Sequence, residues 1–309
     1  MNKDSRIYVA GHNGLAGSAI VRELERKGYE NILTASSKEI DLREPWATGT
    51  LFRKKPEYVF LAAAHAGGIK EAIDNPVEML SDNLKIQNNV IEWSHKYNVK
   101  KLLFLGSSCI YPVDGKQPHK EEQLGTGKTD ENWSYAIAKL AGIELCRAYH
   151  RQYGSNFIAA IPCNLYGPND NFDLEKAHVI PALIRKCCEY EDHIDIWGDG
   201  SVYREFLYVD DLAKACVFLM ENCDYKDLYD GVINVGMGYD YLLNEVIGII
   251  EQVTNYQGKR SYHIDAPKGI MSKLMDVSRI NILGWKAETS LEEGLQKTYE
   301  WYKENSARS

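Results

Sequence analysis

The strongest constraint on the fold is a glycine-rich turn near the start of the chain, at residues 11–17, which read GHNGLAG. An apolar run at 6–10 precedes it, and Ala16, Ile20 and Leu24 recur at helical spacing from within it. Such glycines permit a tight bend, close approach of a pyrophosphate and close packing of helix on strand, and the helix N-terminus attracts an anion. A glycine pattern alone fits an ordinary strand–helix turn equally well, but its place between strand and helix favours a dinucleotide site.

The chain after this turn alternates between short apolar runs and longer helical stretches. Strand-like runs occur at 31–35, 58–63, 102–105 and 157–161. Long helices are predicted at about 78–97 and 134–153. The runs at 58–63 and 102–105 are typical of strands buried on both faces. The alternation predicts an α/β fold, a Rossmann-type doubly wound parallel sheet with right-handed crossovers.

The regular alternation of strands and helices ends after Pro162, and a loop-like stretch covers 164–177. Beyond it we expect a helix at 181–191, a strand through Ile194 and Trp197, two returns to the main sheet at 206–209 and 232–235, and a C-terminal helix at 290–303. We therefore expect two domains. Residues 1–168 plus about 205–235 form the cofactor domain, and about 169–204 plus 236–309 form a smaller, discontinuous substrate domain.

The composition excludes several classes of function. The 309 residues carry a net charge of −8, so the surface repels nucleic acid, and a phosphate-bearing ligand needs a local basic site. The seven cysteines form no disulfide or zinc pattern, which indicates a reducing cytoplasm and no metal site. The N-terminus is unlike a signal peptide, and no apolar run is long enough to span a membrane. We expect a cytoplasmic protein with a small-molecule partner.

The end of the second predicted strand distinguishes NAD from NADP. An NAD site places an acidic residue there for the ribose hydroxyls, whereas this chain has Ser36 and Lys38, which leave room for a 2′-phosphate. Glu39 comes late enough to open the following segment instead, and we expect Asp41 and Leu42 near the adenine. The pattern favours NADP(H), although an ordinary solvated loop would also carry Ser36 and Lys38.

Three residues after the fourth strand and on the next helix fit the reduction of a carbonyl. Ser107 follows the run at 102–105, and Tyr135 and Lys139 share a helix face because they are four residues apart. A lysine and a nicotinamide cation stabilise a phenolate, which lowers the tyrosine pKa from about 10 towards neutrality. Tyr135 can then protonate the alkoxide that forms when hydride reaches a carbonyl, while Ser107 bonds the same oxygen. Alone, the Tyr–Lys spacing more often marks a surface tyrosine beside a solvated lysine.

The glycine turn, the serine and the Tyr–Lys pair, in this order, resemble the extended short-chain dehydrogenase/reductase family over nearly the whole chain. Sugar 4,6-dehydratases of that family carry an Asp-Glu pair where this chain has Ser108 and Cys109, so dehydration is disfavoured. Six stretches are similar to the GDP-L-fucose synthase family of GDP-4-keto-6-deoxymannose 3,5-epimerase/4-reductases. They are LLFLGSSCIYP at 102–112, AAAHAGGI at 62–69, YAIAKLAGI at 135–143, NLYGPNDNF at 164–172, AHVIPALIRK at 177–186 and YREFLYVDDLA at 203–213.

The resemblance implies a GDP-linked 4-keto sugar as substrate and a homodimer formed through the long helices. Cys109 and His178 would flank the sugar as acid and base for inversion at carbons 3 and 5, whose protons the 4-ketone acidifies. Arginines would grip the diphosphate, and an aromatic ring would cover a sugar or base. The matching positions for the nucleotide sugar are Ser108, Asn164, His178, Arg185, Trp197, Arg204 and Lys273. Those for the cofactor are Gly11, Asn13, Gly14, Leu15, Gly17, Ala62, Ala63, Tyr135 and Lys139.

Departures from the family fall near the expected sugar and cofactor. Asn13 replaces an arginine of the glycine turn, which leaves NAD open beside NADP, and His65 replaces a lysine. The sugar is a GDP-4-keto-6-deoxyhexose or a GDP-4-keto-heptose, with 3,5-epimerisation as an optional step. Two alternatives are an NAD-dependent nucleotide-sugar 4-epimerase, which would hold its cofactor permanently, and a redox-sensing regulator. A regulator has no need of Ser107, Tyr135 and Lys139 together.

Overall fold

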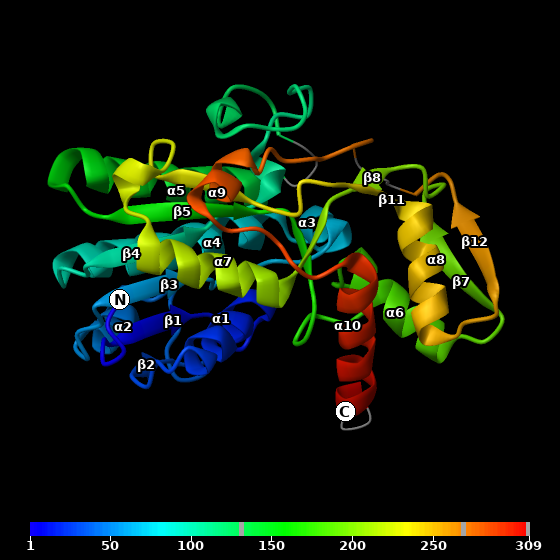
Figure 1. The fold of residues 1–309 in the computed structure, drawn as a ribbon, viewed down its shortest axis with the longest axis horizontal. Helices are drawn as coiled ribbons and strands as arrows, with labels where there is room; N and C mark the ends of the chain where they lie inside the picture. Colours follow the sequence, from blue (N-terminus) through cyan, green and yellow to red (C-terminus); the bar gives the residue numbers. More distant parts are fainter. Residues whose placement is uncertain (130–132, 267–269, 307–309) are drawn as a thin grey trace.

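The computed structural model describes residues 1–129, 133–266 and 270–306, and its centre is a six-stranded sheet in the order β10-β5-β4-β3-β1-β2 (Figure 1). Every pairing within this sheet is parallel. The strands are β1 (Ile7–Ala10), β2 (Ile32–Leu33), β3 (Tyr58–Leu61), β4 (Lys101–Leu105), β5 (Phe157–Pro162) and β10 (Val232–Val235). The predicted α/β fold with a doubly wound parallel sheet is confirmed.

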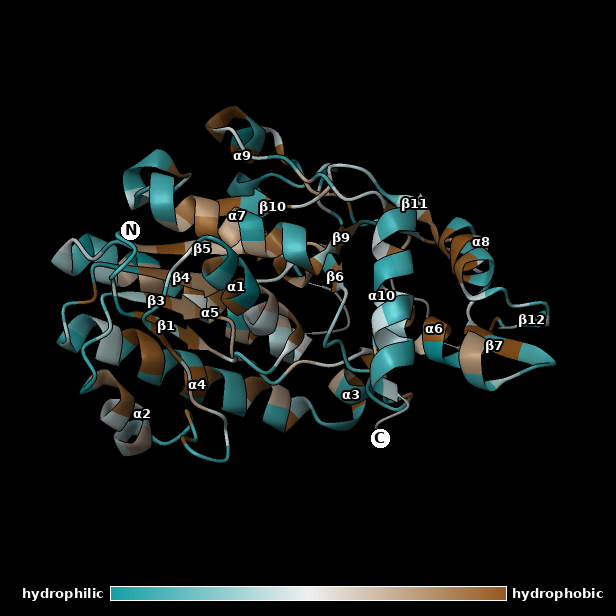
Figure 2. Ribbon diagram, turned by 60° about the horizontal axis from the view of Figure 1, so that its bottom comes forward, coloured by the Kyte–Doolittle hydropathy of each residue, from teal (hydrophilic) through white to brown (hydrophobic). Residues whose placement is uncertain are grey.

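Helices cover both faces of the sheet, as an all-parallel sheet requires. Helix α1 packs against α7 on one face, and α4 packs against α2 and α5 on the other (Figure 1). These helices are α1 (Leu15–Arg26), α2 (Pro45–Phe52), α4 (Pro76–Lys96), α5 (Trp133–Tyr153) and α7 (Val209–Asn222). Figure 2 places the hydrophobic residues on the strands and the inward sides of the helices, so the main core lies between these layers.

A second group of elements lies beyond the carboxyl ends of the strands and has a buried hydrophobic cluster of its own (Figure 1). In it, β7 pairs in parallel with β12, and β8 pairs antiparallel with β11. The helices are α6 (Val179–Glu189), α8 (Leu243–Thr254) and α10 (Leu291–Ser306). The strands are β7 (His193–Trp197), β8 (Tyr203–Arg204), β11 (Tyr241–Leu242) and β12 (Lys259–His263).

The predicted division into two domains stays a proposal, and the two buried clusters follow it over most of the chain. The stretch around α9 (Ser278–Leu283) departs from it, because Met275, Ile280 and Trp285 belong to the cluster of the main sheet. Helix α9 also contacts β10. Part of 236–309 therefore packs with the predicted cofactor domain.

One predicted strand of the main sheet is wrong. The run at 206–209 forms β9 (Phe206–Tyr208), which pairs with β6 (Asn164–Tyr166) in a separate parallel ribbon. All three residues of β9 are buried, which gives the same apolar pattern as a central strand. The run at 232–235 does join the sheet, as β10 next to β5. The sequence analysis did not predict helices α2, α7 and α8 or the short helix α3 (Ile69–Asp74).

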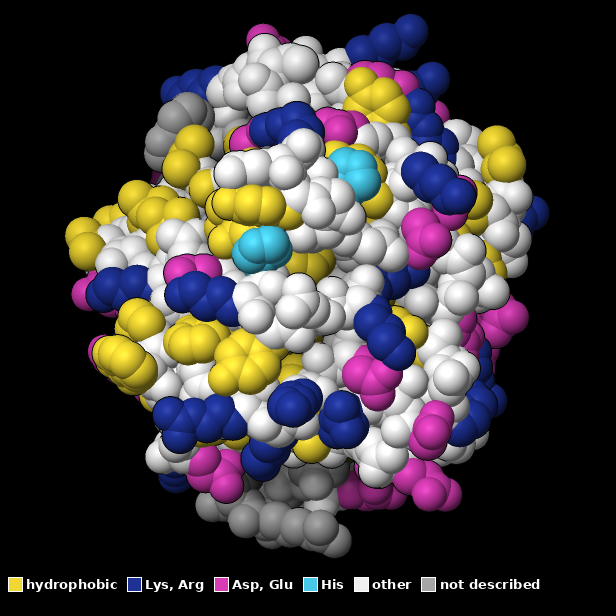
Figure 3. Space-filling view, turned by 90° about the vertical axis from the view of Figure 1, so that its left-hand side faces the viewer, with side chains coloured by type: hydrophobic (Ala, Val, Ile, Leu, Met, Phe, Trp, Pro, Cys, Tyr) yellow, Lys and Arg dark blue, Asp and Glu magenta, His cyan; other side chains and the backbone are white. Residues whose placement is uncertain are grey.

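The surface carries both signs of charge. On the end of the molecule away from the second group of elements, Lys and Arg side chains are interspersed with Asp and Glu (Figure 3). This face therefore lacks the continuous basic field that nucleic acid binding needs. None of the helices in the described ranges combines the length and the apolarity needed to cross a membrane.

A buried lysine closes the C-terminal end of α7. The Lys101 ammonium donates to the carbonyl oxygens of Leu219 and Met220 at 2.8 and 3.2 Å, and also to that of Cys223. The Leu219 carbonyl also accepts from the amide of Cys223 at 3.0 Å, whereas Met220 and Cys223 stand at the end of α7, where carbonyls lack an amide partner in the helix. Lys101 itself is only 4% exposed. Burial lowers the pKa of Lys101, yet the cation satisfies several helix-end acceptors at once.

We expect Lys101→Met to destabilise the protein by about 2 kcal/mol, because it removes the ammonium donor from the buried carbonyl oxygens of Met220 and Cys223. The matched control is Lys100→Met at the next residue, whose exposed ammonium pairs with Glu57. That change should leave the urea midpoint unchanged. Equal midpoints for the two variants in urea unfolding would contradict this account of Lys101.

Candidate functional site

A cavity of about 630 Å³ lies between the carboxyl ends of the main strands and the second group of elements. The residues that follow β1, β3, β4 and β5 all line it. Strand order reverses between β1 and β3, and ligands of open α/β sheets bind at such a switch point. Both predicted domains thus contribute to one site.

The glycine turn forms a close-packed cradle at this cavity. A Cβ on Gly17 would lie 2.1 Å from the carbonyl oxygen of Gly11, and a Cβ on Gly11 would lie 2.7 Å from the backbone of Ala63. Gly11 also has φ +85°, in the region that favours glycine. The N-cap residue of α1 is Gly14, and no side chain of the described residues forms a capping hydrogen bond there. The first N–H groups of the helix are therefore available to an anion. The cradle fits a dinucleotide pyrophosphate.

The predicted cofactor residues divide into two sets. Gly11, Gly14, Leu15, Gly17 and Ala62 line the cavity, together with Tyr135 and Lys139. Asn13, Ser36, Lys38, Asp41, Leu42 and Ala63 lie outside its lining, at or beyond the ends of β1, β2 and β3. The second set remains a prediction for the adenine end of the cofactor.

Glu39 folds back onto the loop after β2 rather than only opening the next segment. Its carboxylate accepts from the amide and the hydroxyl of Ser36 at 2.8 and 2.7 Å, and these bonds lower its pKa. Asp41 binds Arg43, whose guanidinium also donates to Asp82 at 3.1 Å. Arg43 is thus a cation at this end that the sequence analysis missed, although it stands only two residues from Asp41.

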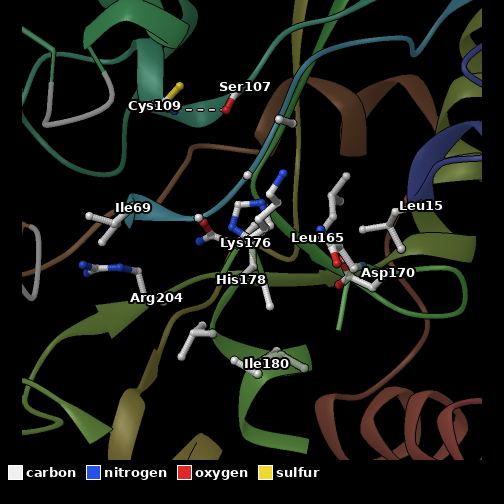
Figure 4. Close-up of a pocket in the computed structure, with 18 of the residues that line it drawn as sticks. Leu15, Ile69, Ser107, Cys109, Leu165, Asp170, Lys176, His178, Ile180 and Arg204 are labelled. Atoms are coloured by element: carbon white, nitrogen blue, oxygen red, sulfur yellow. Dashed lines mark hydrogen bonds between the residues drawn. The ribbon is translucent and has the colours of Figure 1, made fainter. Parts of the chain in front are cut away.

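Ser107, Tyr135 and Lys139 meet at the cavity. Ser107 ends the segment after β4, and its hydroxyl accepts weakly from the amide of Cys109 at 3.5 Å (Figure 4). The ammonium of Lys139 donates to the carbonyl oxygen of Leu105 at 2.8 Å and lies 5.5 Å from the ring centre of Tyr135. One turn of α5 therefore brings the tyrosine and the lysine together beside the end of β4.

Burial sets the ionisation of this group. It lowers the pKa of Lys139 to about 8 and raises that of Tyr135, to which the nearby Cys109 thiol adds. The sequence analysis expected a lowered tyrosine pKa. In the protein alone the phenol instead keeps its proton, so the lysine does not by itself make Tyr135 acidic.

Cys109 and His178 enter the cavity from different parts of the fold. Cys109 is buried just after β4, whereas His178 is the residue before α6 and remains exposed within the cavity (Figure 4). The surrounding protein desolvates the imidazole of His178 and so lowers its pKa. The imidazole is therefore neutral at pH 7 and can accept a proton. Ser108, also buried, lines the same wall.

Four of the predicted nucleotide-sugar residues line the part of the cavity formed by the second group of elements. They are Asn164, Trp197, Arg204 and Lys273. The amide of Asn164 donates to the carbonyl oxygen of Glu205 at 2.8 Å, which ties β6 to β9. Trp197, at the end of β7, is 46% exposed and offers a free ring face.

Arg185 does not line the cavity. Its guanidinium donates to Glu189 at 2.9 Å and to the carbonyl oxygen of Phe172 at 3.0 Å. The neighbouring Lys186 lines the cavity instead. The lining residues of α6 are Val179, Ile180, Ala182, Leu183 and Lys186, and four of them, Val179, Ala182, Leu183 and Lys186, stand at positions i, i+3, i+4 and i+7 of one helix face. The helical phase could have identified Lys186, but only with the correct start of α6.

Two further segments of the lining overlap stretches that resemble the family, but the sequence analysis named no binding or catalytic residue in them. One runs from 64 to 70, up to and into α3, and the other from 169 to 177, before His178. The second contains Asp170, whose Oδ2 is buried without a partner among the described residues, and burial raises its pKa to about 7. A backbone hydrogen bond from Gly68 to Lys176 joins the two segments.

Comparison with known proteins relates this geometry to a family. The model of the "NAD dependent epimerase/dehydratase family" matches residues 7–236. The chain is 45% identical to GDP-L-fucose synthase 1 of Arabidopsis thaliana, over 98% of this chain and 95% of that protein. It also resembles the crystal structure of a GDP-6-OMe-4-keto-L-xylo-heptose reductase from C. jejuni, with TM-score 0.94, 37% identity and 99% of each chain covered.

A further solved structure is described with its cofactor. It is MlghC, a GDP-mannoheptose C4 reductase from Campylobacter jejuni with NADP bound. The TM-score is 0.90 at 38% identity, and the alignment covers 98% of this chain and 99% of that one. The similarity therefore extends through both groups of elements that enclose the cavity.

We expect Lys186→Met to raise the KM for a nucleotide sugar about tenfold, because it removes a cation from the cavity wall. Arg185→Met, one residue away, should change KM less than about twofold, since that guanidinium is engaged by Glu189 and Phe172. Initial rates at varied nucleotide-sugar concentration measure both. If Arg185→Met raised the KM more than Lys186→Met, Arg185 would be the residue that binds the nucleotide sugar, as the sequence resemblance implies.

Proposed function

Because the chain belongs to the NAD dependent epimerase/dehydratase family, we propose that it uses NADPH to reduce the 4-keto group of a GDP-linked 4-keto sugar. The observation that carries this function is the meeting of Ser107, Tyr135 and Lys139 at one cavity with the glycine cradle. The curated relatives are GDP-L-fucose synthases, and the solved ones include reductases of GDP-4-keto sugars. An epimerase/reductase acting on a GDP-4-keto-6-deoxyhexose or a GDP-4-keto-heptose fits both.

The cofactor is NADP(H). The cradle of Gly11, Gly14 and Gly17 would hold its pyrophosphate at the N-terminus of α1. Ser36 and Lys38, with Arg43 nearby, would meet its 2′-phosphate, a task for which Asn13 offers no charge. When bound, NADPH supplies the hydride for the 4-keto carbon. The protein's own residues must hold the ketone in place and supply the proton.

Tyr135 donates that proton to the developing alkoxide. Its raised pKa keeps the phenol protonated, which is the form that reduction consumes. Ser107 donates a hydrogen bond to the same oxygen and orients it. Lys139, held by the carbonyl of Leu105, places positive charge beside the phenolate left after transfer.

Inversion at carbons 3 and 5 is assigned to Cys109 and His178. The two side chains reach the cavity from the end of β4 and the start of α6, so a sugar bound between them presents a different face to each. One removes a proton from a carbon next to the ketone, and the other returns a proton to the opposite face. The neutral imidazole of His178 suits it to the role of base.

The cations of the second group of elements support binding of the GDP diphosphate. Arg204 and Lys273 come from β8 and from the segment before α9, and Lys186 comes from α6. Local positive charge from three elements explains how a chain of net charge −8 meets a doubly charged ligand. Trp197 would cover the base or a sugar ring.

Two further properties belong to this proposal. A homodimer through α4 and α5 is favoured by the resemblance, and a solution mass of about twice 35.1 kDa would support it. A cytoplasmic location is favoured by the seven cysteines, which form no disulfide in the described part of the chain.

We expect Tyr135→Phe to lower the rate of NADPH oxidation with a GDP-4-keto sugar by about a thousandfold, because the alkoxide loses its proton donor. NADPH binding, followed by cofactor fluorescence, should stay within about twofold of the wild type, since the ring remains. Full activity in this variant would show that another group donates the proton. Purified protein that carries tightly bound NAD and consumes no NADPH would favour the 4-epimerase alternative.

We expect deuterium from heavy water to enter carbons 3 and 5 of GDP-4-keto-6-deoxymannose when the protein is incubated with NADP⁺, which cannot reduce it. His178→Gln and Cys109→Ser should each lower this exchange about a hundredfold. Because the pKa of His178 lies below its usual value, the exchange rate should stay level at pH 7 and fall only as the pH drops below about 6.5. Reduction with no deuterium at either carbon would leave both residues as binding residues only.

A further inference from the structure

We propose that the strap, defined as residues 66–71, is a positioning element that holds His178 against the cofactor domain, with Gly68 as its key residue. The strap follows β3 and leads into α3, whereas His178 is reached from the segment 173–178 before α6. Ile69 of the strap, Lys176 and His178 all line the cavity (Figure 4). The inference rests on the proposed role of His178 in epimerisation.

A backbone hydrogen bond joins the two segments. The amide of Gly68 donates to the carbonyl oxygen of Lys176 at 2.9 Å, two residues before His178. Gly68 is buried, and a Cβ at this position would lie 2.6 Å from the carbonyl oxygen of Ala177. The obstacle is backbone, which cannot swing aside as a side chain can, so any larger residue must push the segment that carries His178.

The need for glycine at position 68 is one of space and not of backbone conformation. Its φ is −69°, which any residue adopts, and it stands at the start of α3. A substitution at Gly68 therefore leaves the strap free to keep its own shape. The added methyl group would instead strain the contact with Ala177, so a substitution at Gly68 tests the contact between the two segments.

An ion pair forms the second contact of the strap. The ammonium of Lys70 lies 3.0 Å from the carboxylate of Glu175 and 2.7 Å from that of Asp74. These groups are exposed, so the pair adds little on its own and weakens with salt. It nevertheless joins the same two segments as the bond from Gly68.

The segment before His178 depends on such a contact because its other backbone hydrogen bonds, among those described, stay within the segment or lead to α6. The amides of Lys176 and Ala177 both donate to the carbonyl oxygen of Asp173, and the carbonyl of His178 accepts from Ala182 in α6. These bonds shape the turn and join it to α6. The strap fixes the segment 173–178 relative to the domain that carries Cys109 and Tyr135. In the proposed mechanism, His178 and these two residues act on one sugar ring.

The consequence is specific to epimerisation. Proton transfer between His178 and the sugar needs an alignment that a shift of about 1 Å can disrupt, at a cost of up to about a hundredfold in rate. Ser107 follows β4, Tyr135 and Lys139 stand on α5, and none of the three contacts the strap in the described hydrogen bonds. A displaced strap contact should therefore uncouple proton exchange from ketone reduction.

The test is Gly68→Ala, assayed for deuterium exchange into GDP-4-keto-6-deoxymannose with NADP⁺ and separately for NADPH oxidation. We expect exchange to fall at least about tenfold and NADPH oxidation to fall less than about twofold, the pattern expected of His178→Gln. The matched control is Gly248→Ala on α8, where a Cβ meets only the guanidinium of Arg260 at an ordinary 3.5 Å. It should leave both rates unchanged.

The outcomes separate this inference from the proposed function. If His178→Gln leaves exchange intact, the proposed role of His178 fails. If His178→Gln abolishes exchange but Gly68→Ala leaves the ratio of the two rates at the wild-type value, the positioning role of the strap is wrong and the proposed function stands. An equal fall of both rates also overturns it, because the strap would then only cover the cavity.

Circular dichroism and NADPH binding establish whether Gly68→Ala is folded. If it is not, Lys70→Met carries the test, since it removes the ion pair without adding bulk. We expect about a twofold fall in the ratio of exchange to reduction, and wild-type protein should approach the same ratio as salt is raised. A ratio that neither Lys70→Met nor salt changes would overturn the proposal.

Discussion

The architecture depends on one close contact, between the carbonyl of Gly11 and the Cα of Gly17. Any side chain at Gly17 would overlap that carbonyl, so only glycine lets α1 begin directly against the end of β1. The N-terminus of α1 then points across the carboxyl ends of the strands. Because the strand order reverses between β1 and β3 at the same place, the second group of elements can close over it and enclose the cavity.

Sequence patterns that span only a few residues predicted the strands and the helix face whose contacts lie within the same segment. The strands around Val59 and Phe104 read as apolar runs because both faces are buried, and the four-residue spacing of Tyr135 and Lys139 sets one helix face. Where the pattern was ambiguous, the prediction failed. The run around Leu207 is as buried as a central strand, yet its partner is β6, which no periodicity reveals.

The other errors share a physical cause, which is that burial and pairing between distant segments cannot be read from spacing. Arg185 and Lys186 are adjacent cations, and their roles exchange with a 100° rotation about the axis of α6. The pairing of Gly68 with Lys176 joins residues more than a hundred positions apart. The fold of Glu39 onto Ser36, by contrast, is local, but two conformations of a short polar loop differ too little for sequence to choose between them.

The protonation state of Tyr135 is the one that the proposed reduction requires. An oxidising enzyme needs the phenolate as a base, whereas a reductase needs the phenol as an acid. Burial raises the pKa of Tyr135 and lowers that of Lys139 to about 8, and the Lys139 ammonium donates to the carbonyl of Leu105. The proton is therefore in place before any substrate arrives. In the proposed mechanism the lysine acts after transfer, when the charge that it stabilises first exists, so its interaction would be stronger in the transition state than in the resting protein.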